Sequence, residues 1–145
     1  MKANSKIRYA IRMLLILAKS NTSMNASLLA NIMNVSPKYI RKISGALEKK
    51  KLIVGIQGIY GGYKIAKNPS KIKIKDIFDA YGLDISLTDC TKNKSCKLIN
   101  DCPASEVWNY LYSLIEEKFY SLTLQDIIDK NYLKKMGKRK NSSPS

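Results

Sequence analysis

The sequence VSPKYIRKISGALEKKKLIVGIQGIYGGYKIA, residues 35–66, decides the fold. Ser36 is a good N-cap and Pro37 is a good first helical residue, so a helix is predicted to begin here and to continue to about Lys50. Three apolar residues in it lie at helical spacing and form one face: Ile40, Ile43 and Leu47. The first half of the stretch is therefore predicted to be an amphipathic helix that packs on one side.

A second face of this helix is cationic. Its charged residues also lie at helical spacing: Lys38, Arg41 and Lys42. A helix that packs on one face and presents cations from its N-terminal half on another is suited to the major groove of DNA. Arginine reads guanine through two hydrogen bonds, whereas lysine is as well suited to phosphate. Taken alone, the segment fits an ordinary amphipathic helix with solvated charges equally well.

Residues 52–66 are predicted to form two short strands joined by a glycine-rich turn, because Ile, Val and Tyr are frequent in strands. The turn glycines supply positive φ or allow two backbones to approach closely: Gly58, Gly61 and Gly62. Gln57 and Tyr60 would lie near the tip of this hairpin, within reach of a minor groove or of phosphate. The patterns of nucleotide-binding loops are absent, so a nucleotide-binding loop is not expected.

Two helices are predicted before this stretch. Residues 5–19 and 25–33 show helical spacing, and in the second we expect Leu28, Leu29 and Ile32 to face inward. The short gap between that helix and the next one indicates a helix-turn-helix. A hairpin that directly follows a helix-turn-helix is the arrangement of a winged helix.

Further helices are predicted after the hairpin. A short one over residues 73–81 ends at Gly82, and a long one runs from Pro103 to about Ser121. The long helix and the residue after it carry a wide apolar stripe: Val107, Trp108, Leu111, Leu114, Ile115 and Leu122. A three-helix head does not need this stripe. Part of it is expected to pack against a partner helix, with packing inside the monomer as the alternative.

Thr123 and Asp126 have the spacing of a capping box, which predicts a last short helix near Ile127 and Ile128. Together the elements predict a mainly α fold with a small β-hairpin wing. The expected parts are a winged helix-turn-helix DNA-binding domain (1–82), a cysteine loop (83–102), a dimerisation helix with the final short helix (103–130) and a disordered basic tail (131–145).

The charge of the chain is one-sided. Among 145 residues there are 26 Lys or Arg and 11 Asp or Glu, a net charge of +15. Residues 1–75 hold 16 of the cations and a single acid, Glu48. Such a field is expected where a surface meets DNA or RNA and releases its counterions. A DNA-binding head, a basic RNA-associated module and a simple lysine-rich bias are the three explanations.

Membrane and secretory locations are not expected. The densest apolar run near the N-terminus, residues 13–18, is too short to span a bilayer or to form a signal-peptide core. We therefore expect a cytoplasmic protein with reduced thiols and no membrane partner. Three cysteines cannot pair off within one chain, so a disulfide framework is not expected.

All cysteines lie in DCTKNKSCKLINDC, residues 89–102, with equal gaps between Cys90, Cys96 and Cys102. Thiolates are the natural ligands of iron–sulfur clusters. Structural zinc takes cysteines in pairs roughly two to four residues apart, which these gaps do not provide. A thiol redox switch, favoured by neighbouring lysines, and inert exposed thiols are further interpretations. Without any His a Cys–His catalytic pair cannot form, so enzyme activity is not expected.

The chain resembles the IscR, NsrR and CymR family of dimeric winged-helix transcription regulators over most of residues 1–130. The resemblance lies in SKIRYAIRMLLILA, VSPKYIRKISGALEKKKLI, IQGIYGGYKIA, KIKIKDIFDA, the C-x5-C-x5-C spacing followed by Trp108, and SLTLQDII, all in order. It implies a homodimer that binds a palindromic operator in double-stranded DNA. By position, Lys38, Arg41 and Lys42 would face the groove, with Gln57 on the wing.

In the family, this cysteine spacing marks the cluster-binding members. The resemblance thus makes Cys90, Cys96 and Cys102 expected ligands of an iron–sulfur cluster with two or four irons. The implied function is a transcriptional regulator, acting as a repressor, that senses cluster status, oxygen or nitric oxide. The alternative is a winged-helix regulator without a cluster that responds by thiol redox chemistry or to a small effector.

The fourth ligand of such a cluster is the open point. Some relatives use a His where this chain has Ser105, and others use an Asp where it has Arg8. Neither donor is available here, because the chain has no His and no acid before Glu48. The oxygen donors near the loop are Asp84, Asp89, Asp101, Ser105 and Glu106. Glu106 is favoured because it lies one helical step from Cys102, and a small exogenous ligand is the alternative.

Overall fold

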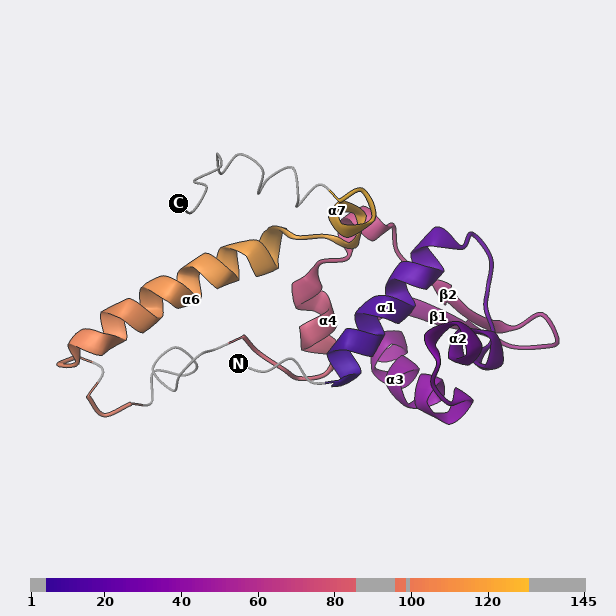
Figure 1. Ribbon diagram of the computed structural model, residues 1–145, viewed down its shortest axis with the longest axis horizontal. Coiled ribbons are helices and arrows are strands. Elements are labelled where there is room, and N and C mark those ends of the chain that lie inside the picture. Colours follow the sequence, from indigo (N-terminus) through magenta and orange to yellow (C-terminus); the bar gives the residue numbers. More distant parts are fainter. Residues whose placement is uncertain (1–4, 86–95, 99, 131–145) are drawn as a thin grey trace, which may run out of the picture.

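A computed structural model describes residues 5–85, 96–98 and 100–130 (Figure 1). The elements in order are α1 (Ser5–Lys19), α2 (Ala26–Met33), α3 (Pro37–Lys49), β1 (Ile53–Ile56), β2 (Gly62–Ile65), the 3₁₀ helix η1 (Pro69–Lys71), α4 (Ile74–Ala80), α6 (Pro103–Ser121) and α7 (Leu124–Ile128). The predicted mainly α fold with one small β-hairpin is confirmed. The predicted disordered tail lies outside the described residues.

The first three helices, the hairpin and α4 share one hydrophobic core. The residues that α1 buries are Ile7, Ala10, Met13, Leu14 and Leu17. In α3 the predicted apolar face is fully buried: Ile40, Ile43 and Leu47. Each large side chain of this kind contributes about 1.5–3 kcal/mol when it is removed from water. The inner face of α3 is therefore fixed, and its other faces remain at the surface.

The turn into α3 follows the sequence prediction. The Ser36 hydroxyl accepts a hydrogen bond from the backbone N–H of Tyr39 at 3.1 Å, and Pro37 occupies the first turn of the helix. Before it, Asn34 ends α2 with a φ of 54°, in the left-handed region that asparagine tolerates. The tight turn between α2 and α3 is the predicted helix-turn-helix.

The inward face of α2 differs from the prediction. Leu28 and Ile32 are 45% and 51% exposed, whereas Leu29 is fully buried. The residues that α2 buries are Leu29, Ala30 and Met33. Apolar residues in adjacent pairs, at 28 and 29 and again at 32 and 33, give the helix two nearly equivalent apolar faces. Packing on α1 and α3, which local spacing does not encode, decides between them.

The wing is an antiparallel hairpin in which Ile53 of β1 pairs with Ile65 of β2. A separate bridge joins Met24, just before α2, to Tyr63 of β2. Gly62 permits this approach: its φ is +149°, and a Cβ there would lie 2.4 Å from the Met24 carbonyl oxygen. The hairpin is therefore fastened to the helix-turn-helix and does not hang free.

The helix α6 forms a long arm that extends away from the head (Figure 1). Ser105 is the one buried residue among those of α6. At the other end of the helix, residues 72–74 pair with residues 122–124 through two backbone hydrogen bonds of 3.0 and 2.9 Å, a pairing that we call the arm clamp. Leu124, the last residue of this pairing, is fully buried in the core of the head. The chain thus returns to the head after the arm.

Among the described residues no helix combines the length and the apolar character that crossing a membrane requires.

Candidate nucleic-acid interface and cysteine segment

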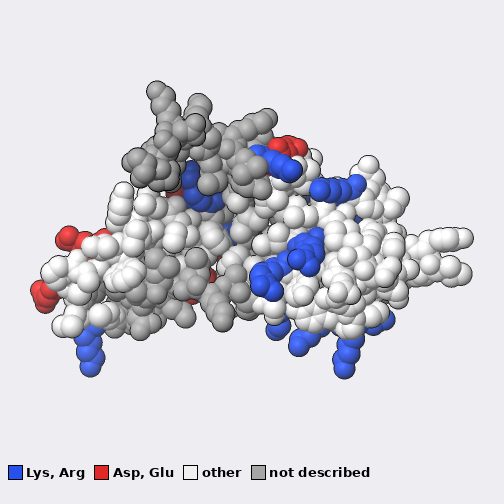
Figure 2. Space-filling view, viewed as in Figure 1, with Lys and Arg blue, Asp and Glu red and all other residues white. Residues whose placement is uncertain are grey.

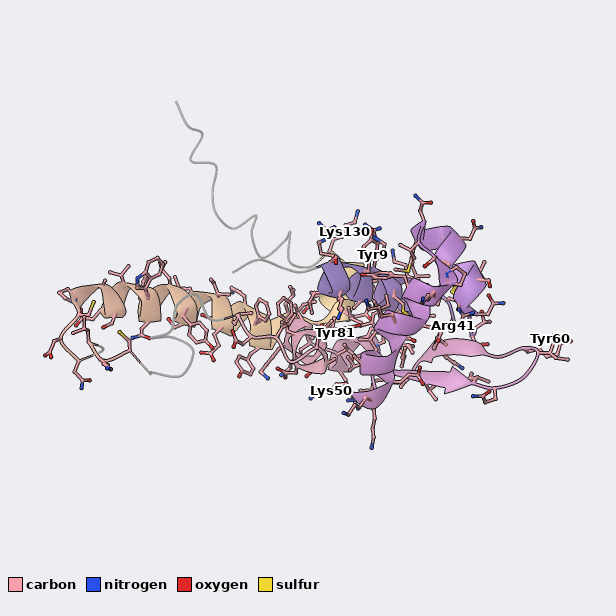
Figure 3. The ribbon with its side chains drawn as sticks, turned by 90° about the horizontal axis from the view of Figure 1, so that it is seen from below. Tyr9, Arg41, Lys50, Tyr60, Tyr81 and Lys130 are labelled. Carbon is pink, nitrogen blue, oxygen red and sulfur yellow. The ribbon has the colours of Figure 1, made fainter. Side chains whose placement is uncertain are left out.

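The outer face of α3 carries the three cations that the sequence singles out: Lys38, Arg41 and Lys42. All are exposed, and within the described part of the chain none of them forms an ion pair. Figure 3 shows Arg41 on α3 and Tyr60 at the far end of the wing. A helix that packs on one face and is cationic on the other is suited to the major groove of DNA. There its cations can contact backbone phosphates and the edges of guanine bases.

On the face that Figure 2 shows, Lys and Arg side chains gather over the head, and acidic side chains lie at the far end of α6 and near α7. Glu48 is the single acid among the first 75 residues. Its carboxylate lies against the base of the wing, since a Cβ on Gly55 would meet the Glu48 Oε2 atom at 3.1 Å. One carboxylate therefore opposes the 16 cations of residues 1–75, which leaves this half of the chain strongly positive.

Tyrosines that are not among the site residues predicted from the sequence hold α3 in place. The Tyr81 hydroxyl, at the end of α4, donates a hydrogen bond to the Ile43 carbonyl of α3 at 2.6 Å, and burial raises the pKa of Tyr81. The rings of Tyr39 and Tyr9 pack edge to face with centroids 5.3 Å apart. The Arg12 guanidinium lies 5.4 Å from the Tyr9 ring centroid. No local pattern indicates a bond between residues 38 positions apart.

The wing tip holds Gln57 and Tyr60, as the sequence predicts, and both are exposed. Between them lies Ile59, which is not among the site residues predicted from the sequence although it is 96% exposed. The Ser23 hydroxyl donates a hydrogen bond to the Tyr60 carbonyl at 3.0 Å. An isoleucine inside a glycine-rich turn was the available signal, because apolar residues are uncommon at positions that nothing covers.

Two of the three cysteines lie in the described segments just before α6. Cys96 and Cys102 are free and half-buried, and Cys102 directly precedes α6. The buried Ser105 hydroxyl donates to the Cys102 carbonyl at 2.8 Å, while Glu106 is exposed in the first turn of α6. Cys90, like Asp89, lies outside the described residues. In the described part of the chain, no three Cys, Asp or Glu side chains come together as a metal site, so Glu106 stays a prediction.

A cavity of about 200 Å³ lies between α4, residues 83–85 and α6. Its apolar and aromatic lining consists of Phe78, Leu83, Ile85, Tyr112, Phe119 and Tyr120. Burial and the nearby Glu116 carboxylate raise the pKa of Tyr112, whose hydroxyl donates to Glu116 at 3.4 Å. On the rim, a hydrogen bond to Asp79 raises the pKa of Lys75. The cavity combines an apolar floor with a charged rim.

Residues 3–130 match the sequence profile of Rrf2, described as an iron-dependent transcriptional regulator. The chain belongs to the Rrf2 family. A candidate HTH-type transcriptional regulator of Haemophilus influenzae is 28% identical over 96% of this chain and 94% of its own length. The HTH-type transcriptional regulator IscR of Yersinia pseudotuberculosis is 24% identical over 98% of this chain and 88% of its own length.

Solved structures of Rrf2 relatives agree with the fold. CymR, the global cysteine regulator of B. subtilis, is 26% identical, covers 90% of this chain and 98% of its own, and superposes with a TM-score of 0.76. IscR of T. potens is 25% identical, covers 90% of this chain and 88% of its own, and gives a TM-score of 0.70. This Rrf2 protein is therefore a DNA-binding transcriptional regulator with a winged-helix head, and not an enzyme.

Proposed function

We propose that this Rrf2 protein is a homodimeric repressor that reports iron–sulfur cluster status, oxygen or nitric oxide. The observation that carries its DNA-binding part is the exposed cationic face of α3 opposite a fully buried one. In the major groove, Arg41 would read a guanine edge, while Lys38 and Lys42 hold phosphate or a second base. Gln57 and Tyr60 of the wing would contact the neighbouring minor groove or backbone.

The dimer would form through α6. Six of its large hydrophobic side chains are extensively exposed: Val107, Trp108, Tyr110, Leu111, Leu114 and Tyr120. Within the described residues the chain covers them only in part. A second copy of the same helix is the partner that matches a stripe at helical spacing. Two heads joined in this way would read the two halves of a palindrome.

Cys90, Cys96 and Cys102 would hold the cluster. The donor set fits in kind, since Cys96 and Cys102 are free, half-buried thiols and thiolate is the usual cluster ligand. A bound cluster supplies redox chemistry. Because Cys102 directly precedes α6, holding or releasing its sulfur would act on the end of α6 that lies away from the head, and so on the spacing of the heads in the dimer. Glu106 is the proposed fourth ligand.

The cluster is tested by purifying the protein without oxygen, recording its visible spectrum and assaying iron and acid-labile sulfide. We expect coloured protein that contains both elements, and loss of both in Cys96→Ala. Glu106→Ala should also lose or weaken the colour if that carboxylate is a ligand. Asn109→Ala, one turn further along α6 and exposed, is the matched control and should keep it. Colourless protein without iron after reconstitution would contradict the cluster.

DNA recognition is tested separately by fluorescence anisotropy with duplexes that the protein itself selects from a random pool. We expect a palindromic consensus, with affinity that falls as salt rises because phosphate contacts release counterions. Tighter binding to structured RNA than to every selected duplex would contradict the operator and favour an RNA-associated module.

The cavity between α4 and α6 supports a second candidate, a regulator without a cluster that binds a small effector. An effector with an apolar body and a cationic group would suit the Phe78 and Phe119 floor and the Glu116 carboxylate. Colourless protein whose operator affinity nevertheless changes with a small molecule, and no longer does so in Glu116→Gln, would favour this candidate.

A further inference from the structure

We propose that the wing tip, Ile59 with Tyr60, is an apolar wedge that enters the minor groove and opens a flexible base step. The protein would then select its operator partly by how readily the DNA bends. The inference rests on the DNA binding proposed above and deepens it, because it assigns to the wing a specificity that its polar contacts do not supply.

The tip is built as a rigid projection. Met24 and Tyr63 exchange two backbone hydrogen bonds of 2.9 and 2.8 Å, which fasten β2 to the start of α2. Nearer the tip, the Gly61 N–H donates to the Gly58 carbonyl at 3.0 Å and closes the turn. A Cβ on Gly61 would lie 2.1 Å from the Ile56 carbonyl oxygen, so this turn accepts only glycine there. A preorganised tip loses little conformational entropy when it binds.

The side chains on this projection are bare. Ile59 and Tyr60 are 96% and 91% exposed, the highest values among large hydrophobic residues in the described part of the chain. Figure 2 shows the tip as an uncharged finger beyond the blue side chains of the head. Single exposed apolar residues are ordinary. Two adjacent ones at the end of an anchored hairpin, beside a DNA-reading helix, indicate a contact that is made on the DNA.

Charge decides what kind of contact this is. Residues 52–63 contain no Lys or Arg, so the tip cannot gain affinity by releasing counterions from phosphate. Apolar side chains in a minor groove act in another way: they insert between base pairs, unstack them and kink the duplex by roughly 20–90°. Pyrimidine–purine steps such as TA and CA unstack most readily. The wing should therefore prefer these steps although it does not read their edges.

The experiment compares the wild type with Ile59→Ala and Tyr60→Ala on duplexes that each protein selects from a random pool. Bending is measured by energy transfer between dyes at the two duplex ends, and unstacking by 2-aminopurine placed at the step facing the wing. Val54→Ala is the matched control, because Val54 is a half-exposed apolar residue at the base of the same hairpin.

We expect the wild type and Val54→Ala to enrich a TA or CA step at the wing positions, to bend the duplex and to brighten 2-aminopurine. Both tip variants should lose the bend and on the order of tenfold of the preference for that step, while they keep the bases read by α3 and the salt dependence. Equal bending and equal step preference in all four proteins would overturn the wedge. A wild type that enriches no sequence would instead overturn the proposed function itself.

Ile59→Lys separates the wedge from a phosphate contact. A wedge loses its bend in this variant. Tighter binding with a steeper salt dependence and an unchanged bend would place the tip beside phosphate and overturn the inference.

Discussion

The helices α1 and α6 are both long and apolar on one side, yet they differ in how far that side is buried. α1 spans 15 residues and buries five of them, including Leu14, in the core of the head. α6 spans 19 residues and buries only Ser105. Both of its leucines and three of its aromatic residues, Trp108, Tyr110 and Tyr120, are exposed, and Leu114 is 45% exposed. The comparison teaches that the apolar stripe of α1 completes the fold of the chain, whereas much of the stripe of α6 stays exposed among the described residues, where the proposed dimer would cover it.

The strongest test of this contrast is to truncate the same side chain in each helix. Leu14→Ala should lower the free energy of unfolding by about 2–5 kcal/mol, because a fully buried leucine leaves a cavity. Leu114→Ala should cost much less at protein concentrations low enough to dissociate a dimer. Urea denaturation followed by circular dichroism, at several protein concentrations, measures both. Equal losses would show that α6 is as integral to the head as α1.

Placing a charge on the apolar side of α6, or on its other side, tests whether α6 forms the proposed dimer interface. Leu114→Glu should weaken dimerisation about 100-fold, roughly 2.7 kcal/mol, since a carboxylate would be buried without a partner. Ser113→Glu puts the same charge on an exposed position outside the apolar stripe and should leave the dimer intact. Sedimentation equilibrium measures the dissociation constants. An unchanged dissociation constant for Leu114→Glu would show that α6 is not the dimer interface.

The same contrast predicts that DNA contacts come from the head and not from the arm, because the exposed cations of α3 belong to the head. Arg41→Ala should cost about 1–3 kcal/mol of operator affinity and relax preference at one base pair. Lys118→Ala, on the arm, should leave the affinity unchanged. Anisotropy titrations on a set of single-base operator variants measure both. A uniform loss on every sequence, with a shallower salt dependence, would make Arg41 a phosphate contact instead.

The smallest effect is expected where α4 joins the head to the arm. Tyr81→Phe removes the hydrogen bond to the Ile43 carbonyl and should lower stability by about 0.5–1.5 kcal/mol. Burial raises the pKa of Tyr81 in the folded protein, so its contribution is present below the ordinary tyrosine pKa near 10 and declines as pH rises beyond it. Urea midpoints measured through this range should fall less steeply for Tyr81→Phe. Urea midpoints that fall equally steeply with pH in both proteins would show that Tyr81 does not cause the loss of stability at alkaline pH.

Local patterns predicted most of the head. Ser36 and Pro37 mark the start of α3, and the capping box between Thr123 and Asp126 marks α7, because caps depend on residues three apart. Periodicity chose the right face of α3 but the wrong one for α2, where Leu28 and Leu29 are equivalent by spacing. The burial of one leucine and the exposure of the other follow from tertiary packing.

The parts that could not be predicted are contacts between distant segments. The hydrogen bond from Tyr81 to Ile43, the fastening of Tyr60 by Ser23 and the arm clamp each join residues far apart in the chain. The short 3₁₀ helix after Asn68 was missed because a single turn leaves little periodicity. For the candidate site, the residue types were readable from the sequence, whereas the degree to which Ile59 projects was not.

The arm clamp makes α6 a lever with its fulcrum at the head. A helix of 19 residues is about 28 Å long, so a tilt of only about 10° at the clamp displaces its far end by about 5 Å. Successive base pairs of DNA are about 3.4 Å apart. In a dimer joined through two such helices, this rotation would be too small to disturb the core of either head. It would still move the two α3 helices out of register with the two halves of a palindromic site.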